Sequence, residues 1–162
     1  MGRLCTLAEM MAVREQLRRE GKRLVFTNGV FDILHRGHCE YLRDARAQGD
    51  AMVIGLNSDA SVRRLKGENK PIVHEEDRAA VLGALASVDY VLIFDEDTPY
   101  VIISALLPDI LIKGGDYALD DIVGRNEVEA AGGQVLTIPL TEGRSSTNII
   151  STIIERYCKH ER

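Results

Sequence analysis

Apolar residues are concentrated in five short runs, and longer amphipathic segments separate these runs. Short, nearly continuous apolar runs are typical of strands that are buried on both faces of a sheet. They lie at residues 23–27, 51–56, 90–94, 110–113 and 134–138. Because strands that alternate with helices form parallel sheets with helices on both faces, the pattern predicts an α/β fold. We expect a doubly wound, five-stranded parallel sheet flanked by helices.

The segments between the strands predict helices with recognisable ends. Residues 7–20 place apolar side chains on one side, and Gly21 is a natural stop. Thr98 is the expected N-cap of a helix with Pro99 in its first position and its end near Leu107. Further helices are expected at residues 37–47, from Asn57-Ser58-Asp59 to Leu65, and at 75–86, 124–131 and 147–157. The polar segment 66–74 contains Gly and Pro, which predicts a mobile loop.

The chain is expected to form a single domain, residues 1–162. It has 162 residues, enough to bury a core, and we find no linker, repeat or low-complexity segment. Residues 1–22 would be an N-terminal helix, and residues 24–157 a catalytic core.

Charge and cysteine usage narrow the cellular setting and the partners. The net charge of −5 argues against nucleic acid, which selects a basic face. No apolar run reaches membrane-spanning length, and no signal peptide pattern is present. Three scattered cysteines favour a reducing, cytoplasmic setting. Residues 1–6 fit the loose myristoylation pattern, but nothing else indicates a membrane.

The first strand leads into His35-Arg36-Gly37-His38, the segment that carries most of the chemical signal. A strand-to-helix turn presents free backbone N–H groups and the positive end of a helix dipole, and both favour an anion. The two imidazoles could donate to phosphate oxygens that Gly37 lets approach closely. Two alternatives stay open: a metal site with Cys39 as a further ligand, and a structural role for both histidines. No G-x-G-x-x-G and no P-loop is present to hold a nucleotide instead.

Other candidate residues follow the ends of later strands, where ligands of parallel sheets bind. Lys113 precedes two glycines and could neutralise a phosphate or simply be solvated. Residues 142–147 place Arg144 and three hydroxyls at a helix start, which suits phosphate or ribose but also an ordinary N-cap. Lys66 lies at the loop that could close as a lid. Arg78 could face an anion or pair with Glu75 or Glu76.

The motif of residues 27–38, Thr-x-Gly-x-Phe-Asp-x-x-His-x-Gly-His, with Arg-Ser-Ser-Thr at 144–147, resembles the cytidylyltransferase-like nucleotidyltransferases. Longer strings resemble the D-glycero-β-D-manno-heptose 1-phosphate adenylyltransferases within that superfamily. They include residues 57–67, 76–78, 97–99, 113–117 and 142–145, and the similarity runs from about Leu24 to Tyr157. Ser146 departs from the more frequent Thr but keeps the hydroxyl. The resemblance implies a Rossmann-like sheet.

The resemblance also implies a reaction: ATP and heptose 1-phosphate would give ADP-heptose and pyrophosphate, with Mg²⁺ on the triphosphate. A separate heptose kinase would supply the sugar phosphate, and a homodimer is expected, with the N-terminal helix or residues 75–107 as its surface. The implied catalytic residues are His35, His38, Lys66, Lys113 and Arg144, with no protein metal site. The implied nucleotide-binding residues are Thr27, Asn28, Gly29, Phe31, Gly37, Gly114, Ser145, Ser146 and Thr147. The implied sugar-phosphate-binding residues are Asp32, Asn57, Arg78 and Asp116.

Two other functions remain open at this point. One is a related transferase that acts on glycerol 3-phosphate or phosphoethanolamine with CTP. This alternative stays open because no single residue indicates whether the nucleotide is ATP or CTP. The other is a non-catalytic module that binds a nucleotide or a metal.

Overall fold

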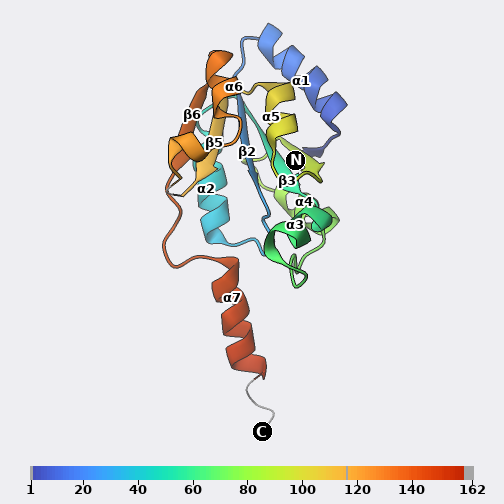
Figure 1. Cartoon of the computed structure of the whole chain (residues 1–162), viewed down its shortest axis with the longest axis vertical. Helices are drawn as coiled ribbons and strands as arrows, with labels where there is room; N and C mark the ends of the chain where they lie inside the picture. The colour runs from blue at the N-terminus through green and yellow to red at the C-terminus, as the bar shows by residue number, and fades with distance from the viewer. Residues whose placement is uncertain (1, 116, 159–162) are drawn as a thin grey trace.

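A computed structural model describes residues 2–115 and 117–158, and its centre is a parallel sheet. The strands follow the order β1-β4-β3-β2-β5-β6, and every neighbouring pair is parallel (Figure 1). Their bounds are β1 Arg3–Leu4, β2 Leu24–Gly29, β3 Ala51–Asn57, β4 Tyr90–Phe94, β5 Ile110–Gly114 and β6 Gln134–Ile138. The α/β prediction is confirmed, but the sheet has six strands, so the expected number of five was wrong. The missed strand β1 has two exposed residues, too few to produce a pattern.

Helices lie on both faces of the sheet. Their bounds are α1 Leu7–Arg19, α2 Arg36–Arg46, α3 Asp59–Lys66, α4 Glu75–Gly83, α5 Tyr100–Leu106, α6 Arg125–Ala130 and α7 Ser146–Ile153. A 3₁₀ turn spans Leu119–Asp121, and a π-helical turn, Ile154–Cys158, continues α7. The helix expected at 75–86 ends earlier, at Gly83. Pro99 itself is the N-cap of α5, so the assignment of Thr98 as N-cap was wrong: the ψ of Pro99, 15°, lies outside the helical range.

The core has two halves, one on each face of the sheet. Phe26 and Val53 pack on the face covered by α1 and α5, whereas Val25 and Ile54 pack on the face covered by α2 and α4. Alternate residues of one strand therefore enter different apolar clusters, as expected for strands buried on both sides. None of the helices within residues 2–115 and 117–158 is both long and apolar enough to cross a membrane.

Strand β2 lies at the point where the strand order reverses. It pairs with β3 along its whole length, from Leu24 to Gly29. Its pairing with β5 covers only Val25 and Phe26, so the two strands stop pairing before their carboxyl ends. A crevice therefore opens there, and in open α/β sheets this switch point is the place where ligands bind.

Helix α7 departs from the layered arrangement. The last strand leads into a loop, residues 139–145, which includes a turn at 142–143, and α7 then projects away from the rest of the molecule (Figure 1). No residue of α7 or of the turn that follows it is buried.

Candidate active site

The two histidines lie at the start of α2, directly beyond the carboxyl end of β2. His35 is the N-cap residue, in extended conformation and without a side-chain capping bond. Its carbonyl accepts the N–H of His38 at 2.9 Å. The imidazole rings are stacked with centroids 3.8 Å apart and an interplanar angle of 22°. The helix start thus places both rings side by side at the switch point.

Both histidines present a nitrogen that lacks a partner. The Nδ1 atoms of His35 and His38 are buried, and neither has a hydrogen-bond partner among the described residues. Buried polar atoms in folded proteins are nearly always hydrogen-bonded, so such atoms require an explanation. A ligand that brings hydrogen-bonding oxygens to this turn would satisfy them.

The surroundings hold both imidazoles in the neutral form. Burial, with a smaller contribution from the neighbouring His35, lowers the pKa of His38 to about 4. Burial also lowers the pKa of His35, and the nearby Arg144 guanidinium adds to this effect. A neutral imidazole donates through one nitrogen only. The histidines are therefore arranged as hydrogen-bond donors, and Arg144 supplies the positive charge.

Gly37 and Gly29 make room around this turn. A Cβ on Gly37 would lie 3.2 Å from the side chains of both His35 and Arg144. A Cβ on Gly29 would lie 2.9 Å from the ring of Phe31, which itself has a φ of 46°. The left-handed region costs energy for a residue with a side chain. In this backbone conformation, the ring of Phe31 lies edge-on to the ring of His38, with the two ring centroids 5.3 Å apart.

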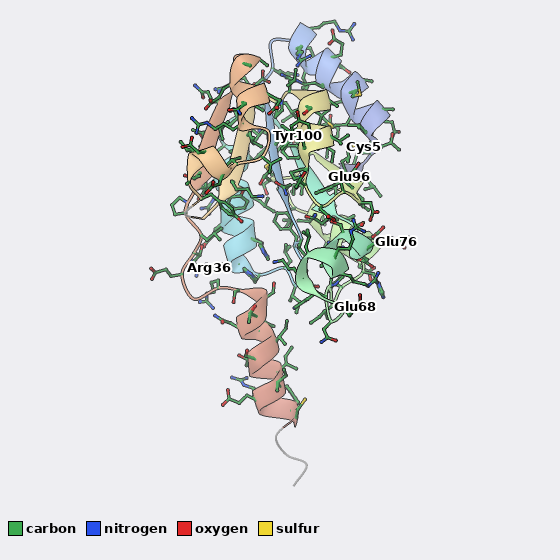
Figure 2. All side chains as sticks on the ribbon, viewed as in Figure 1. Cys5, Arg36, Glu68, Glu76, Glu96 and Tyr100 are labelled. Carbon is green, nitrogen blue, oxygen red and sulfur yellow. The ribbon has the colours of Figure 1, made fainter. Side chains whose placement is uncertain are left out.

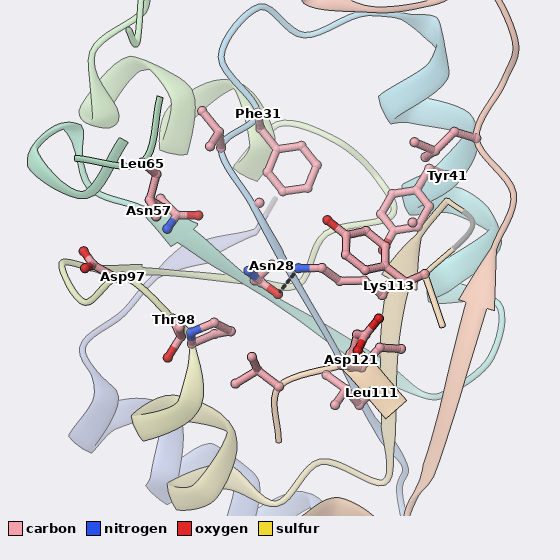
Figure 3. Close-up of a pocket in the computed structure, with 18 of the residues that line it drawn as sticks. Asn28, Phe31, Tyr41, Asn57, Leu65, Asp97, Thr98, Leu111, Lys113 and Asp121 are labelled. Carbon is pink, nitrogen blue, oxygen red and sulfur yellow. Dashed lines mark hydrogen bonds between the residues drawn. The ribbon is translucent and has the colours of Figure 1, made fainter. Parts of the chain in front are cut away.

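A cavity of about 420 Å³ occupies the crevice between β2 and β5 (Figure 3). Lys113, from the end of β5, reaches into it and donates to Asn28 Oδ1 at 2.9 Å. Burial alone lowers the pKa of Lys113. Its ammonium also lies 5.6 Å from the centroid of the Tyr117 ring. Within residues 2–115 and 117–158 its contacts are an amide oxygen and an aromatic ring, and a partly buried cation in such surroundings is suited to receive an anion.

Other predicted residues line the same cavity or a neighbouring one. His38, Lys66 and Phe31 border both the first cavity and another of about 350 Å³, which also contains Ser146 and Thr147. Gly29, Asn57 and Gly114 line the first cavity. His35, Arg144 and Ser145 line a third cavity, of about 380 Å³, at the base of α7. Ser145 is also the N-cap of α7, so the capping alternative holds for it.

Three predicted site residues bind other groups of the protein. Thr27 and Arg78 line none of the three cavities, whereas Asp32 also borders the second one. Thr27 is fully buried, and its hydroxyl pairs with Tyr41 at 2.6 Å. Arg78 is buried and donates to Val30 O, Val73 O and Asp59, so it pairs with neither Glu75 nor Glu76. Asp32 accepts the backbone N–H groups of residues 72 and 73 at 2.8 and 2.9 Å and forms an ion pair with Lys70.

These contacts show what Asp32 and Arg78 do in the free protein. Both connect the turn after β2 to the loop that follows α3, so they fix the loop beside Lys66. The direct sugar-phosphate contacts predicted for them stay predictions. Asp116 lies outside the described residues.

Sequence reasoning missed some residues of the cavity walls. Tyr41 borders the cavity, and its hydroxyl pairs with that of Thr27. Asp97 and Asp121 contribute carboxylates to the wall, and Lys70 borders the second cavity. Their residue types alone do not distinguish them from ordinary core or surface residues, so only the folded arrangement reveals them. Among residues 2–115 and 117–158, no group of three or more His, Cys, Asp or Glu could hold a metal ion.

Comparison with known proteins finds relatives that share one name. "Bifunctional protein HldE" of Syntrophotalea carbinolica is 57% identical over 145 residues, which are 90% of this chain and 30% of that protein. The protein of the same name from Geobacter sulfurreducens is 56% identical over 138 residues, 85% of this chain and 28% of that protein. This chain thus spans under a third of the length of these curated relatives.

Solved structures resemble the fold. The lipopolysaccharide core biosynthesis protein from Thermoplasma volcanium has a TM-score of 0.62 at 30% identity, covering 76% of this chain and 100% of that one. Pantothenate synthetase from Thermus thermophilus, at 18% identity and a TM-score of 0.61, shares the fold alone and covers 91% of this chain and 67% of that one. The cytidylyltransferase-like family model matches residues 26–152, from β2 into α7. The chain therefore belongs to the cytidylyltransferase-like family.

Proposed function

We propose that this protein transfers the adenylyl group of ATP to D-glycero-β-D-manno-heptose 1-phosphate, giving ADP-heptose and pyrophosphate. The observation that carries the proposal is the pair of buried, unpartnered histidine nitrogens at the switch point of a cytidylyltransferase-like sheet. Partly buried Lys113 lines the adjoining cavity and supplies a second anion site. The similarity to a protein of lipopolysaccharide core biosynthesis supports a sugar substrate.

The chemistry requires little proton transfer. An oxygen of the sugar 1-phosphate attacks the α-phosphorus of ATP. The bond between the α-phosphorus and the oxygen that bridges it to the β-phosphorus breaks, and pyrophosphate leaves with that oxygen. A phosphate monoester has a second pKa of about 6, so the nucleophile is largely ionised at neutral pH. The protein then has to align two anions and stabilise the charge that develops in an in-line displacement.

The proposed roles follow from where the side chains lie. His35 and His38 donate hydrogen bonds to the α-phosphoryl oxygens and the leaving pyrophosphate, and Arg144 neutralises the β- and γ-phosphates. Ser145, Ser146 and Thr147 lie beside them at the start of α7. Lys66 is exposed at the end of α3, between two of the cavities, where it closes over the phosphates.

Lys113 is proposed to bind the phosphate of heptose 1-phosphate, whose oxygen attacks ATP. Asn28, Gly29, Phe31 and Gly114 border the nucleotide. Asn57, which lines the first cavity, is proposed to bind the sugar phosphate.

Magnesium fits this site as a companion of the triphosphate. Mg²⁺ is usually held by one or two carboxylates together with substrate phosphates. The carboxylates of Asp97 and Asp121 line the cavity, and they match that oxygen chemistry. A magnesium ion there would neutralise charge on the phosphates.

The substrates and setting complete the proposal. Heptose 1-phosphate has to come from a kinase that acts on the anomeric oxygen, and we propose that a heptose kinase activity supplies it. Relatives of this chain carry the word "bifunctional" in their names.

Cys5, Cys39 and Cys158 are all free, and the cytoplasmic setting stays a prediction.

A pyrophosphate-release panel tests the assignment. It crosses ATP, CTP and GTP with heptose 1-phosphate, glycerol 3-phosphate and phosphoethanolamine. We expect ATP with heptose 1-phosphate to be the best pair. A best pair of CTP with either other acceptor would identify a related cytidylyltransferase instead, and no release with any pair would favour a binding module.

Matched histidine variants complete the panel. His38→Ala should lower the rate by about 10²–10³, the usual loss for one donor aimed at a transition state. His74→Ala is the control, because that side chain is 80% exposed and lines none of the three cavities described above. Equal rates for the two variants would contradict the role of His38.

A further inference from the structure

The hydroxyl of Tyr41 lies where strands β2 and β5 separate. The two strands pair as far as Phe26 and Leu111. In the same register Thr27 would face Ile112, but at this level a side chain from α2 enters instead. The Tyr41 hydroxyl pairs with Thr27 Oγ1 at 2.6 Å and donates to the carbonyl of Ile112 in a longer bond of 3.4 Å. One phenol therefore connects both strand ends to the helix that carries the two histidines.

The two bonds of this bridge have a defined order, because each hydroxyl carries one proton. The carbonyl of Ile112 can only accept, so Tyr41 donates to it and Thr27 donates to Tyr41. Burial raises the pKa of Tyr41 to about 12, so the phenol keeps its proton at neutral pH. Tyr41 and Thr27 are 6% and 0% exposed, and at such burial little water competes for the bonds.

The next level of the same opening holds the candidate anion site. Asn28 follows Thr27 on β2, and Lys113 follows Ile112 on β5. Lys113 Nζ donates to Asn28 Oδ1 at 2.9 Å, and Figure 3 shows both side chains and Tyr41 at the same cavity. The Tyr41 bridge thus lies one residue before the cation and its amide partner on each strand. It therefore fixes the separation of the two backbones from which these side chains extend.

The ring of Tyr41 is fitted between the histidine helix and the end of β5. A Cβ on Gly114 would lie 3.2 Å from Tyr41 Cε2, so a glycine at this position leaves room for the ring. His38 and Tyr41 are three residues apart on α2, which places them on neighbouring positions of one helix face. The same helix therefore directs an imidazole toward the phosphate site and a phenol toward the strand ends.

We propose that Tyr41 is a positioning residue, whose phenol bridges the ends of β2 and β5 and thereby holds Lys113 in place relative to His38. Transfer between two bound anions requires that the groups holding them stay aligned. The role given to Lys113 here rests on the proposed function. A tyrosine that only fills the core would contribute to stability and leave the binding of the sugar phosphate unchanged.

Tyr41→Phe removes both bonds of the bridge and keeps the bulk of the ring. In pyrophosphate release, the KM for heptose 1-phosphate should rise about 10–100-fold, because lost alignment costs up to about 10². The KM for ATP should change little, since the bridge adjoins the residues assigned to the sugar phosphate. A loss of folded protein alone would lower kcat and leave both KM values in place. An unchanged KM for heptose 1-phosphate would overturn the proposal.

Tyr100→Phe is the matched control. Tyr100 lies on α5 and is labelled in Figure 2, and its hydroxyl donates to Glu127 at 2.9 Å. The residue is 47% exposed and lines none of the three cavities of the candidate site. This variant also removes a hydrogen-bonded phenol hydroxyl, and it should keep the wild-type KM values. Equal changes in the two variants would contradict a specific role of Tyr41.

The other hydroxyl of the bridge gives a second, independent pair of variants. Thr27→Val removes the hydroxyl at nearly constant volume and should raise the KM for heptose 1-phosphate as Tyr41→Phe does. Thr27→Ser keeps the hydroxyl and should recover most of that loss. Equal losses for the serine and valine variants would show that the hydroxyl has no part in the effect, and would overturn the bridge.

A double-mutant cycle separates positioning from a general loss of stability. If Tyr41 acts through the pair of Lys113 and Asn28, Tyr41→Phe should cost much less in an Asn28→Ala background than in the wild type. Residues that act independently give losses that add. Additive losses in kcat/KM for heptose 1-phosphate would therefore refute the positioning role.

Binding of inorganic phosphate without ATP distinguishes this proposal from the proposed function. Phosphate should shift the amide NMR signals of Asn28 and Lys113, and it should bind more weakly to Tyr41→Phe than to Tyr100→Phe. No pyrophosphate release by the wild type, together with weaker phosphate binding by Tyr41→Phe, would refute the adenylyltransferase and support the bridge. An active wild type, with Tyr41→Phe equal to Tyr100→Phe in both measurements, would do the reverse.

Discussion

Loss of the Asn28 side chain tests how the site holds its buried cation. Lys113 Nζ donates to Asn28 Oδ1 at 2.9 Å, and burial is the cause that lowers the pKa of Lys113. A hydrogen bond to a charged group contributes about 1.5–3 kcal/mol. Because 1.36 kcal/mol corresponds to a factor of ten, Asn28→Ala should lower kcat/KM for heptose 1-phosphate about 10–150-fold.

The pH dependence gives this prediction a sharper form. The amide oxygen stabilises the ammonium, so its removal favours the neutral amine and moves the alkaline limb of kcat/KM to lower pH. Asp97, Asp121, Lys66 and His38 border the same cavity and remain unchanged.

The assay is pyrophosphate release at saturating ATP, with heptose 1-phosphate varied from pH 6 to pH 10. Asn126→Ala, an exposed substitution on α6, is the matched control. If Asn28→Ala and this control gave the same kcat/KM and the same alkaline limb, Asn28 would have no role in holding Lys113.

Three further perturbations probe other parts of the account. Burial lowers the pKa of Lys113, so the ammonium is costly to hold in this site. Lys113→Met removes that charge, and thermal denaturation should show a higher Tm than wild type while activity falls; a lower Tm would contradict the cost of this charge. The ring of His38 should titrate in NMR spectra near pH 4, and pyrophosphate should raise that value; a free-protein pKa near 6.5 would refute its neutral, buried state. Arg78→Lys should cost about 3–5 kcal/mol in urea denaturation, because it breaks a buried network with Asp59 and two carbonyls; an unchanged midpoint would argue against that structural role.

The sequence predicted the fold well because burial on both faces leaves a strong pattern. Strands β4 and β6 have the predicted bounds. Apolar and aromatic residues fill β4, and Val135, Leu136 and Ile138 form most of β6. Strand β1 escaped prediction because its two residues are exposed and its only signal is pairing with β4. The direction of α7 also lies beyond the sequence, because the bonds of residues 141 and 146 to distant segments set it.

The site was predictable where a motif carries the chemistry and unpredictable where the fold decides which way a side chain turns. The two histidines and Arg144 come together as the motifs indicate. Thr27 and Arg78 have residue types suited to ligand binding, yet both are buried. Thr27 pairs with Tyr41, and Arg78 pairs with Asp59. Their partners are distant in sequence, so no local pattern could reveal the pairing.

Transfer of label from ATP tests the central claim most directly. The protein is incubated with heptose 1-phosphate and ATP labelled at either the α- or the γ-phosphorus, and the products are separated by chromatography. The account predicts that α-label appears in ADP-heptose, that γ-label appears in pyrophosphate, and that His38→Ala suppresses both. Label from the γ-phosphorus in a sugar phosphate, or no labelled ADP-heptose at all, would contradict it.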